Sequence, residues 1–198
     1  MSLNLTINEN DISGSFKRIA NELLNDWMIQ VGSKHYRIAE IEFYYNSEHH
    51  NDPYAHGHAL QNEKGRWYFH GSGLDLTFGE NGSFGGILIR AIHDFKGKNY
   101  VYGPLNCITE LFSKLPNIYD SNSSISFGLI EAKESDFIKE KTIAAPRVGL
   151  NPVKDEAKCK ALYRFLVMPK NKHAEKTKIE ESMQKNGASP DETKKIWG

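Results

Sequence analysis

The sequence is poor in cysteine, lacks a long apolar run and carries no net charge, and each absence excludes a class of protein. Its two cysteines, Cys107 and Cys159, form no CxxC pair, which excludes disulfide-rich and CxxC metal-binding proteins and predicts reduced, buried side chains. No apolar run approaches the roughly 18 residues of a membrane-spanning helix. Because residues 1–14 are polar and lack the apolar segment of a secretory signal, we expect a cytoplasmic protein with no membrane partner.

The balance of charge argues against a protein that binds nucleic acid chiefly through its phosphates. The chain has 25 Lys and Arg residues and 25 Asp and Glu residues, whereas such proteins usually show a basic excess. The distribution is uneven, because residues 1–60 carry four basic and eight acidic residues while residues 151–198 carry eleven and seven. Any affinity for nucleic acid is therefore expected to lie in the C-terminal third.

A chain of 198 residues is long enough for one domain with a substantial core and short for two. We therefore expect one domain over residues 1–169. Residues 170–198 are charged and have few apolar side chains, and Ser189 to Glu192 form a capping box with proline at the first helical position. This segment is interpreted as an appended charged helical tail that contributes little to the core.

Two segments of the domain have the apolar periodicity of surface helices. The first covers residues 15–30, with Ser13 or Ser15 as its cap. Its apolar residues repeat at helical spacing: Phe16, Ile19, Ala20, Leu23, Leu24 and Trp27. The second covers residues 104–115, where Gly-Pro opens the helix.

Short aromatic and β-branched runs separated by glycine turns predict antiparallel strands. The opening strand covers residues 36–45. Alternation places Ala39, Ile41, Phe43 and Tyr45 on its core face, and Glu40, Glu42 and Tyr44 on a face that looks to a cleft or to water. Two strands and a glycine-rich reversal follow within residues 66–86, and a further strand covers residues 87–95. "FGLIEA" and "ALYRFLVM" are late strands, with "APRVGLNP" as a constrained loop between them.

Several motifs occur in a fixed order along these elements. They are "RIAEIEFY", a histidine about a dozen residues later, G-x-G-L before a strand, "ILIRAI", "GP" opening a helix, "PRVGL" and a final "YRF" strand. This succession, from about Tyr36 to Val167, resembles the alkyladenine (3-methyladenine, methylpurine) DNA glycosylase family. The resemblance implies a single α+β domain with a curved, mostly antiparallel sheet flanked by helices. It also implies removal of alkylated or deaminated purines from damaged double-stranded DNA in base excision repair, by a monomer that needs no cofactor or metal.

The resemblance assigns roles to individual residues. The second acid of the family's E-x-E-x-Y motif matches Glu42, which would activate the catalytic water, and Arg90 would lie near that water. Tyr44 would stack on the flipped base, and His56, with His58 as its alternative, would contact the base or the sugar phosphate. A second aromatic side chain is needed on the other side of the base, and Tyr68 is the candidate.

This sequence departs from the family pattern in the segments that contact DNA. The family's T-P-R-N segment has no clear counterpart, although Asn62 and Arg66 lie nearby in "ALQNEKGRW". Where the family inserts a tyrosine into the duplex, Phe78 or Phe84 would serve as the wedge, but Asp75 and Glu80 would repel phosphates. Phe78 and Arg66 are therefore the candidate DNA contacts.

The chemistry needs only one carboxylate. Cleavage of an N-glycosidic bond passes through a sugar with oxocarbenium character, which an ionised glutamate stabilises while it deprotonates the attacking water. Glu40 and Glu42, about 7 Å apart on a strand, also match the carboxylate spacing of inverting glycosidases. The structural alternatives are a solvated strand edge, or a buried ion pair between Arg90 and either glutamate. Such an ion pair is compatible with catalysis because it keeps Glu42 ionised.

Two other functions stay open at this point. One is a hydrolase of the same fold that acts on nucleosides, nucleotides or RNA, which the neutral charge and the altered hairpin favour. The other is a binding module without catalytic activity. A metal site built from the histidine-rich loop at residues 49–58 is the weakest hypothesis, because no second ligand pair with suitable spacing follows.

Overall fold

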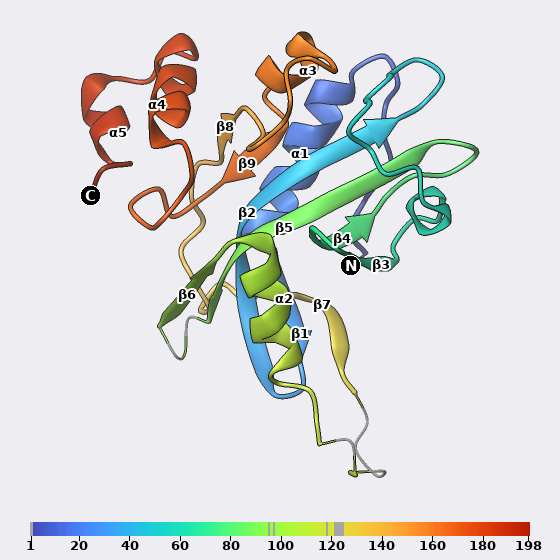
Figure 1. Cartoon of the computed structure of the whole chain (residues 1–198). Helices are drawn as coiled ribbons and strands as arrows, with labels where there is room; N and C mark the ends of the chain where they lie inside the picture. Colours follow the sequence, from blue (N-terminus) through green and yellow to red (C-terminus); the bar gives the residue numbers. More distant parts are fainter. Residues whose placement is uncertain (1, 95, 97, 118, 121–124) are drawn as a thin grey trace.

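Two long antiparallel strands, β2 (Lys34–Asn46) and β5 (Phe84–Asp94), form the centre of the fold (Figure 1). The structure, a computed structural model, describes residues 2–94, 96, 98–117, 119–120 and 125–198. The sheet has the order β3-β4-β5-β2-β1-β7, with β6 paired to β5 and β9 paired to both β2 and β8. Its other strands are β1 (Trp27–Val31), β3 (Trp67–His70), β4 (Gly73–Thr77), β6 (Asn99–Tyr102), β7 (Phe127–Glu131), β8 (Ile143–Ala145) and β9 (Arg164–Leu166).

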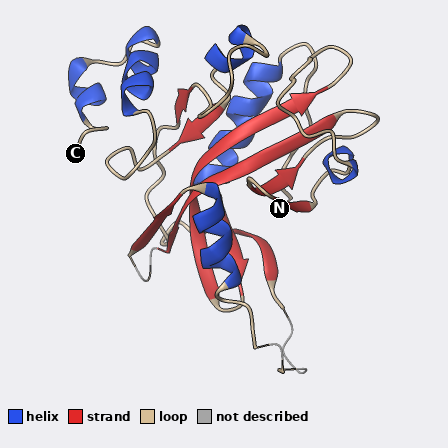
Figure 2. Ribbon diagram, in the orientation of Figure 1, coloured by secondary structure: helices blue, strands red, loops and turns tan. Residues whose placement is uncertain are grey.

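Helices cover both faces of this sheet (Figure 2). They are α1 (Ile12–Asn25), the single turn η1 (Ala59–Asn62), α2 (Pro104–Phe112), α3 (Glu156–Lys160), α4 (Lys176–Lys185) and α5 (Pro190–Lys194). On one face the α1 ring of Phe16 stacks on Phe43 at 4.4 Å, and on the other Glu110 of α2 accepts a hydrogen bond from Tyr36. All strand pairings are antiparallel. The predicted class, a single α+β domain with a curved, mostly antiparallel sheet flanked by helices, is confirmed.

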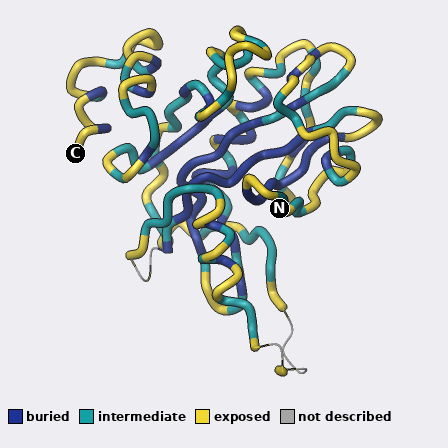
Figure 3. Tube along the Cα trace, viewed as in Figure 1, coloured by how far each residue is buried: buried dark blue, intermediate teal, exposed yellow. Residues whose placement is uncertain are grey.

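The β2 strand is buried on both faces over most of its length (Figure 3). Its apolar face is part of the core as predicted, because Ala39, Ile41, Phe43 and Tyr45 are all buried. Of the two alternatives for the polar face, a cleft or water, exposure to water is wrong, since Glu40 and Glu42 are both 0% exposed. Each carboxylate is compensated by buried cationic groups and hydrogen bonds, which is the condition for keeping a charge away from water.

The boundaries of the predicted elements shift at several places. The helix expected at residues 15–30 ends at Asn25, and Trp27–Val31 becomes strand β1 because it pairs with both β2 and β7. Asp11 caps α1, since its carboxylate accepts a hydrogen bond from the Gly14 N–H; neither Ser13 nor Ser15 does so. The predicted strand at 36–45 and helix at 104–115 are present with moved ends. The last residue of the strand expected at 87–95 lies outside the described residues.

The tail is helical, as predicted, but it is not peripheral. Helix α5 has the expected capping box of Ser189 and Glu192 with Pro190 in its first turn. Ile179 and Ile196 are fully buried against Ala145 and Leu166 of the sheet, and His173 is hydrogen-bonded to Glu40. The prediction that residues 170–198 contribute little to the core is therefore wrong.

Two further expectations concern the cysteines and the membrane. Cys107 is buried and Cys159 is partly exposed, and both are free thiols. Burial raises the pKa of the Cys107 thiol to about 12. Within the described part of the chain, no helix is both long and apolar enough to cross a membrane.

Candidate active site

Glu42 is completely buried and is held at both of its carboxylate oxygens. The Val148 N–H donates to Oε1 at 2.7 Å, and the Tyr44 hydroxyl donates to Oε2 at 2.9 Å. Arg90 Nη1 donates to Oε2 at 3.2 Å. Burial raises the pKa of Glu42 above the ordinary value for a glutamate, although Arg90 and the Val148 N–H oppose that shift. The result is a carboxylate in a fixed position, bound by a permanent cation.

Arg90 joins Glu42 to Glu40. Its Nε donates to Glu40 Oε1 at 2.9 Å while its Nη1 reaches Glu42, so the ion pair predicted with either glutamate forms with both. Burial by itself lowers the pKa of Arg90, but the charges of Glu42 and Glu40 raise it above its ordinary value. Arg90 therefore stays charged and fixes the spacing of the two carboxylates.

The "PRVGL" segment closes over Glu42 as a rigid loop. Arg147 is buried and binds Asp52 with both terminal nitrogens, at 2.6 and 3.2 Å, and its Nη1 also donates to the Phe43 carbonyl at 3.0 Å. Its guanidinium lies over the ring of Tyr44 at 4.6 Å. These contacts place the adjacent Val148 N–H within hydrogen-bonding distance of Glu42. The constrained loop predicted from the sequence therefore helps to hold the Glu42 carboxylate.

A cavity of about 440 Å³ lies next to these residues, within the size range of small-molecule sites. Tyr44, Arg90 and Val148, all three hydrogen-bond partners of Glu42, line it. The rest of the lining is Pro53, Tyr54, Ala55, His56, Gln61, His70, Ser72, Asp75, Leu88, Pro104, Gly149, Leu150 and Lys154. Glu42 itself lies directly behind this wall.

The predicted base-binding residues lie at or beside the cavity. Tyr44 and His56 line it. Tyr68 does not, but its ring is 6.0 Å from that of His56, 4.8 Å from that of His70, and stacked on that of His58 at 4.5 Å. Burial and the neighbouring His70 lower the pKa of His56. Tyr68 therefore packs against the histidines beside the cavity.

The two predicted DNA contacts have different outcomes. Phe78 is 1% exposed and packs on Tyr45 at 5.3 Å and on Phe43 at 5.8 Å, so the prediction that it contacts DNA is wrong. The prediction came from the place of Phe78 in the hairpin from which the family inserts a tyrosine, but the ring packs in the core against β2 and α1. Arg66 is exposed and lies 3.6 Å from Glu63, which leaves its predicted role open.

Among the lining residues without a site role assigned from the sequence, Asp75, His70 and Gln61 are joined by hydrogen bonds. Asp75, on β4, is 2% exposed. Its Oδ1 lies 3.1 Å from His70 Nε2, and its Oδ2 accepts a hydrogen bond from Gln61 Nε2 at 3.1 Å. Asp75 had been interpreted only as a charge that repels phosphates. The glycine at position 86 is the sequence feature connected with this pair, because a Cβ there would stand 2.3 Å from Asp75 Oδ2 and 2.7 Å from Gln61 Nε2.

Glu40 has a separate set of partners on the side away from the cavity. Arg164 Nε donates to its Oε1 at 2.9 Å, and His173 Nδ1 lies 2.5 Å from its Oε2. The other ring nitrogen of His173 faces the Met168 carbonyl at 3.1 Å. Burial opposes ionisation of Glu40, but His173, Arg164 and Arg90 together lower its pKa to about 2. The predicted salt bridge of Glu40 is thus a buried cluster completed by the tail.

The histidine-rich loop does not come together as a metal centre. His50 points inward, with Nδ1 2.8 Å from the Tyr45 carbonyl and Nε2 3.0 Å from the Tyr163 hydroxyl. Asp52 is paired with Arg147, and His58 stacks on Tyr68. In the part of the chain that the structure describes, no group of three or more His, Cys, Asp or Glu side chains is placed to hold a metal ion.

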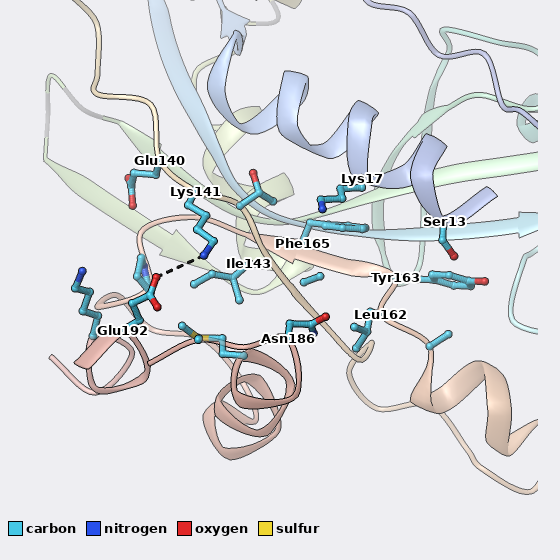
Figure 4. Close-up of a pocket in the computed structure, with 17 residues that line it drawn as sticks. Ser13, Lys17, Glu140, Lys141, Ile143, Leu162, Tyr163, Phe165, Asn186 and Glu192 are labelled. Atoms are coloured by element: carbon cyan, nitrogen blue, oxygen red, sulfur yellow. Dashed lines mark hydrogen bonds and ion pairs between the residues drawn. The ribbon is translucent and has the colours of Figure 1, made fainter. Parts of the chain in front are cut away.

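A larger cavity, of about 700 Å³, lies between α1, β9 and the tail (Figure 4). Ile143, Leu162 and Phe165 give it apolar walls. Its two glutamates are already paired, Glu192 with Lys141 at 3.5 Å and Glu140 with Arg37 at 2.9 Å. This cavity offers apolar surface, and its two carboxylates are held in ion pairs, so the candidate active site is the smaller cavity beside Glu42.

Comparison with known proteins adds one relative. No family model matches the chain. The chain is 26% identical over 199 residues to the uncharacterized protein L759 of Acanthamoeba polyphaga mimivirus, an alignment that covers 84% of this chain and 92% of that protein. The similarity therefore extends over nearly the whole length of both chains.

Proposed function

We propose that the protein is a DNA glycosylase-like hydrolase that cleaves the N-glycosidic bond of purines, with Glu42 as the base that activates water. One observation carries the proposal: a buried carboxylate, fixed by Arg90 and the Val148 N–H, stands directly behind a cavity lined by Tyr44 and His56. A carboxylate fixed beside a cation and a pocket aromatic is the arrangement that glycosidic hydrolysis by a single base requires.

The free acceptor capacity of Glu42 is what allows it to act on water. A carboxylate accepts about four hydrogen bonds, and Val148, Tyr44 and Arg90 occupy three positions. The proposal requires that a water reach the remaining one, which is on Oε1 beside the Val148 N–H. The water oxygen then bonds to the anomeric carbon, the bond to the base nitrogen breaks with its electron pair leaving on the base, and Glu42 accepts the proton of the water.

Arg90 and Tyr44 support this step in different ways. The charge of Arg90 favours the ionised form of Glu42, which burial disfavours, and an ionised carboxylate stabilises the positive charge that develops on the sugar. The Tyr44 hydroxyl donates a hydrogen bond to Glu42, and Tyr44 also lines the cavity. A base stacked on that ring would be oriented for attack.

The form of the substrate has two candidates. A damaged purine in double-stranded DNA is the one implied by the resemblance to the alkyladenine DNA glycosylases. A free nucleoside or nucleotide is favoured by the burial of Phe78, which removes one of the two predicted wedge residues, and by the absence of a net positive charge. A binding module without activity is the third candidate, because a buried ion pair can also be purely structural.

Glu42→Gln tests the proposal directly. The substitution keeps the size and most hydrogen bonds of the side chain but removes its charge. We expect single-turnover base release to fall by about 10²- to 10⁴-fold, the usual cost of losing a general base. The assay measures release of 3-methyladenine, hypoxanthine or 1,N6-ethenoadenine from a duplex, beside release from free nucleosides that include guanosine.

Glu48→Gln is the matched control, because Glu48 is an exposed glutamate just beyond the end of β2. It should release base at the wild-type rate. Release from duplex supports the repair function, and release from nucleosides alone supports the second substrate form. Folded wild-type protein that releases no base from any substrate contradicts the proposal and leaves the binding module.

A further inference from the structure

Asp75 and Glu42 stand at two ends of one row of side chains. In the strand register Asp75 of β4 pairs with Leu88 of β5, and Leu88 pairs with Glu42 of β2. Residues paired directly across antiparallel strands point to the same face. Their backbones are two strand spacings, roughly 10 Å, apart, and Leu88 lies on the cavity surface between them. A group that reacts at Glu42 can therefore extend along this row to Asp75.

The Asp75 carboxylate is held in a fixed orientation from both sides. His70 contacts Oδ1 and Gln61 donates to Oδ2, each at 3.1 Å. The Ser72 N–H donates to His70 Nδ1 at 3.3 Å, which leaves Nε2 to carry the proton toward Asp75. Gly86 makes room for the Asp75–Gln61 pair, since a Cβ there would meet both side chains within 2.7 Å.

These two contacts leave each oxygen of Asp75 with acceptor capacity. A carboxylate oxygen accepts about two hydrogen bonds, and one position on each is taken. Asp75 lines the cavity, so its remaining acceptors form a rigid pair on the cavity wall. The complement of such a pair is a planar group with two adjacent N–H donors.

We infer that Asp75 reads the edge of the purine and selects guanine-type bases, which present the N1–H and the 2-amino group side by side. This inference rests on the proposed function, because it takes the cavity to be the purine site. Hypoxanthine offers only the N1–H. Adenine places the N1 lone pair against the carboxylate and is disfavoured by repulsion between two acceptors. A buried polar group selects strongly, because the wrong base leaves it unpaired.

Binding measured without turnover tests the inference. Isothermal titration calorimetry in the Glu42→Gln background compares guanosine, inosine and adenosine. The expected order of affinity is guanosine, then inosine, then adenosine. Adding Asp75→Asn should weaken guanosine binding by roughly 10- to 100-fold, the usual cost of losing hydrogen bonds to a buried charged acceptor. It should also improve adenosine relative to guanosine, because an amide offers one donor and one acceptor.

Glu80→Gln is the matched control, since it removes a carboxylate from the β4–β5 turn of the same hairpin, where Glu80 pairs with Lys64. Glu80→Gln, added to the same Glu42→Gln background, should leave the order of affinity unchanged: guanosine, then inosine, then adenosine. The ranking in the Glu42→Gln protein alone tests the inference even if the Asp75 variant fails to fold. Adenosine binding as tightly as guanosine, an Asp75→Asn protein that keeps the preference, or no binding of any nucleoside overturns the inference.

The outcomes for the two proposals separate. Asp75-dependent binding of guanosine to a wild-type protein that hydrolyses no substrate contradicts the proposed hydrolase and leaves the base-reading role standing. Hydrolysis that depends on Glu42 but shows no preference among the three purines contradicts the role of Asp75 alone.

Discussion

Glu40 and Glu42 are two residues apart on one strand, equally buried and bound to the same arginine, yet their environments differ. Glu40 is enclosed by Arg164 and the tail residue His173 as well as Arg90. Among the residues that the structure describes, Glu42 is bound by one cationic group, Arg90, and by two neutral donors, and a cavity lies next to it. The pKa of Glu40 is lowered to about 2, whereas burial raises that of Glu42. A buried carboxylate surrounded by cations stabilises a fold, and one with fewer cations and a nearby cavity is available for chemistry.

The largest expected effect on stability comes from removing the C-terminal tail, which supplies His173 to the Glu40 cluster. Truncation after Pro169 deletes His173, Ile179 and Ile196. The two isoleucines each contribute about 1.5–3 kcal/mol through burial, and loss of His173 leaves Glu40 less well compensated. We expect the unfolding free energy, measured by urea titration, to fall by about 5 kcal/mol or more, or the protein to aggregate.

The control for this truncation removes only Trp197 and Gly198. Trp197 is 55% exposed, so we expect a loss below about 1 kcal/mol, within the usual range for changes at the surface. A truncation at Pro169 that unfolds at the same urea concentration as the full chain would show that the tail is independent of the Glu40 cluster.

The sequence predicted the frame of the site well because strands and helices leave local patterns. The alternation in residues 36–45 located the core face of β2, and the ion pair of Arg90 followed from its position between Leu88 and Ile92. Both inferences needed only the period of a strand and the cost of an unpaired buried charge.

What the sequence could not supply depends on contacts between distant segments. The burial of Glu40 comes partly from His173, more than a hundred residues away, and no local pattern links them. Trp27–Val31 became a strand because two other strands pair with it. Phe78 was assigned to the DNA from the resemblance to the family's hairpin, but the ring's direction is set by packing on Phe43 and Tyr45.

The next effect compares the same substitution at the two glutamates. Glu40→Gln leaves Arg164, His173 and Arg90 without their shared carboxylate charge, and breaking a buried ion pair in this way costs about 3–5 kcal/mol. Glu42→Gln should cost clearly less, because burial already disfavours the charged form of Glu42. Urea unfolding at neutral pH measures both. Equal losses at the two positions would remove the distinction between a structural and a reactive glutamate.

The smallest effect is the pH dependence of stability, in which the two glutamates act on opposite sides of pH 4.5. The folded pKa of Glu40 lies below its ordinary value of 4.5, so its contribution is present above pH 4.5 and is lost as pH falls toward about 2. The folded pKa of Glu42 lies above 4.5, so its contribution is present below that pH and is lost as pH rises through the folded pKa. Relative to wild type, Glu40→Gln should therefore reduce the loss of unfolding free energy as pH falls from 4.5 toward about 2, the acid limb of the pH profile. Glu42→Gln should flatten the decline above pH 4.5. Unfolding titrations at a series of pH values, with Glu48→Gln as the control, measure both limbs, and a Glu40→Gln protein whose acid limb matches wild type would contradict the assignment of that limb to Glu40.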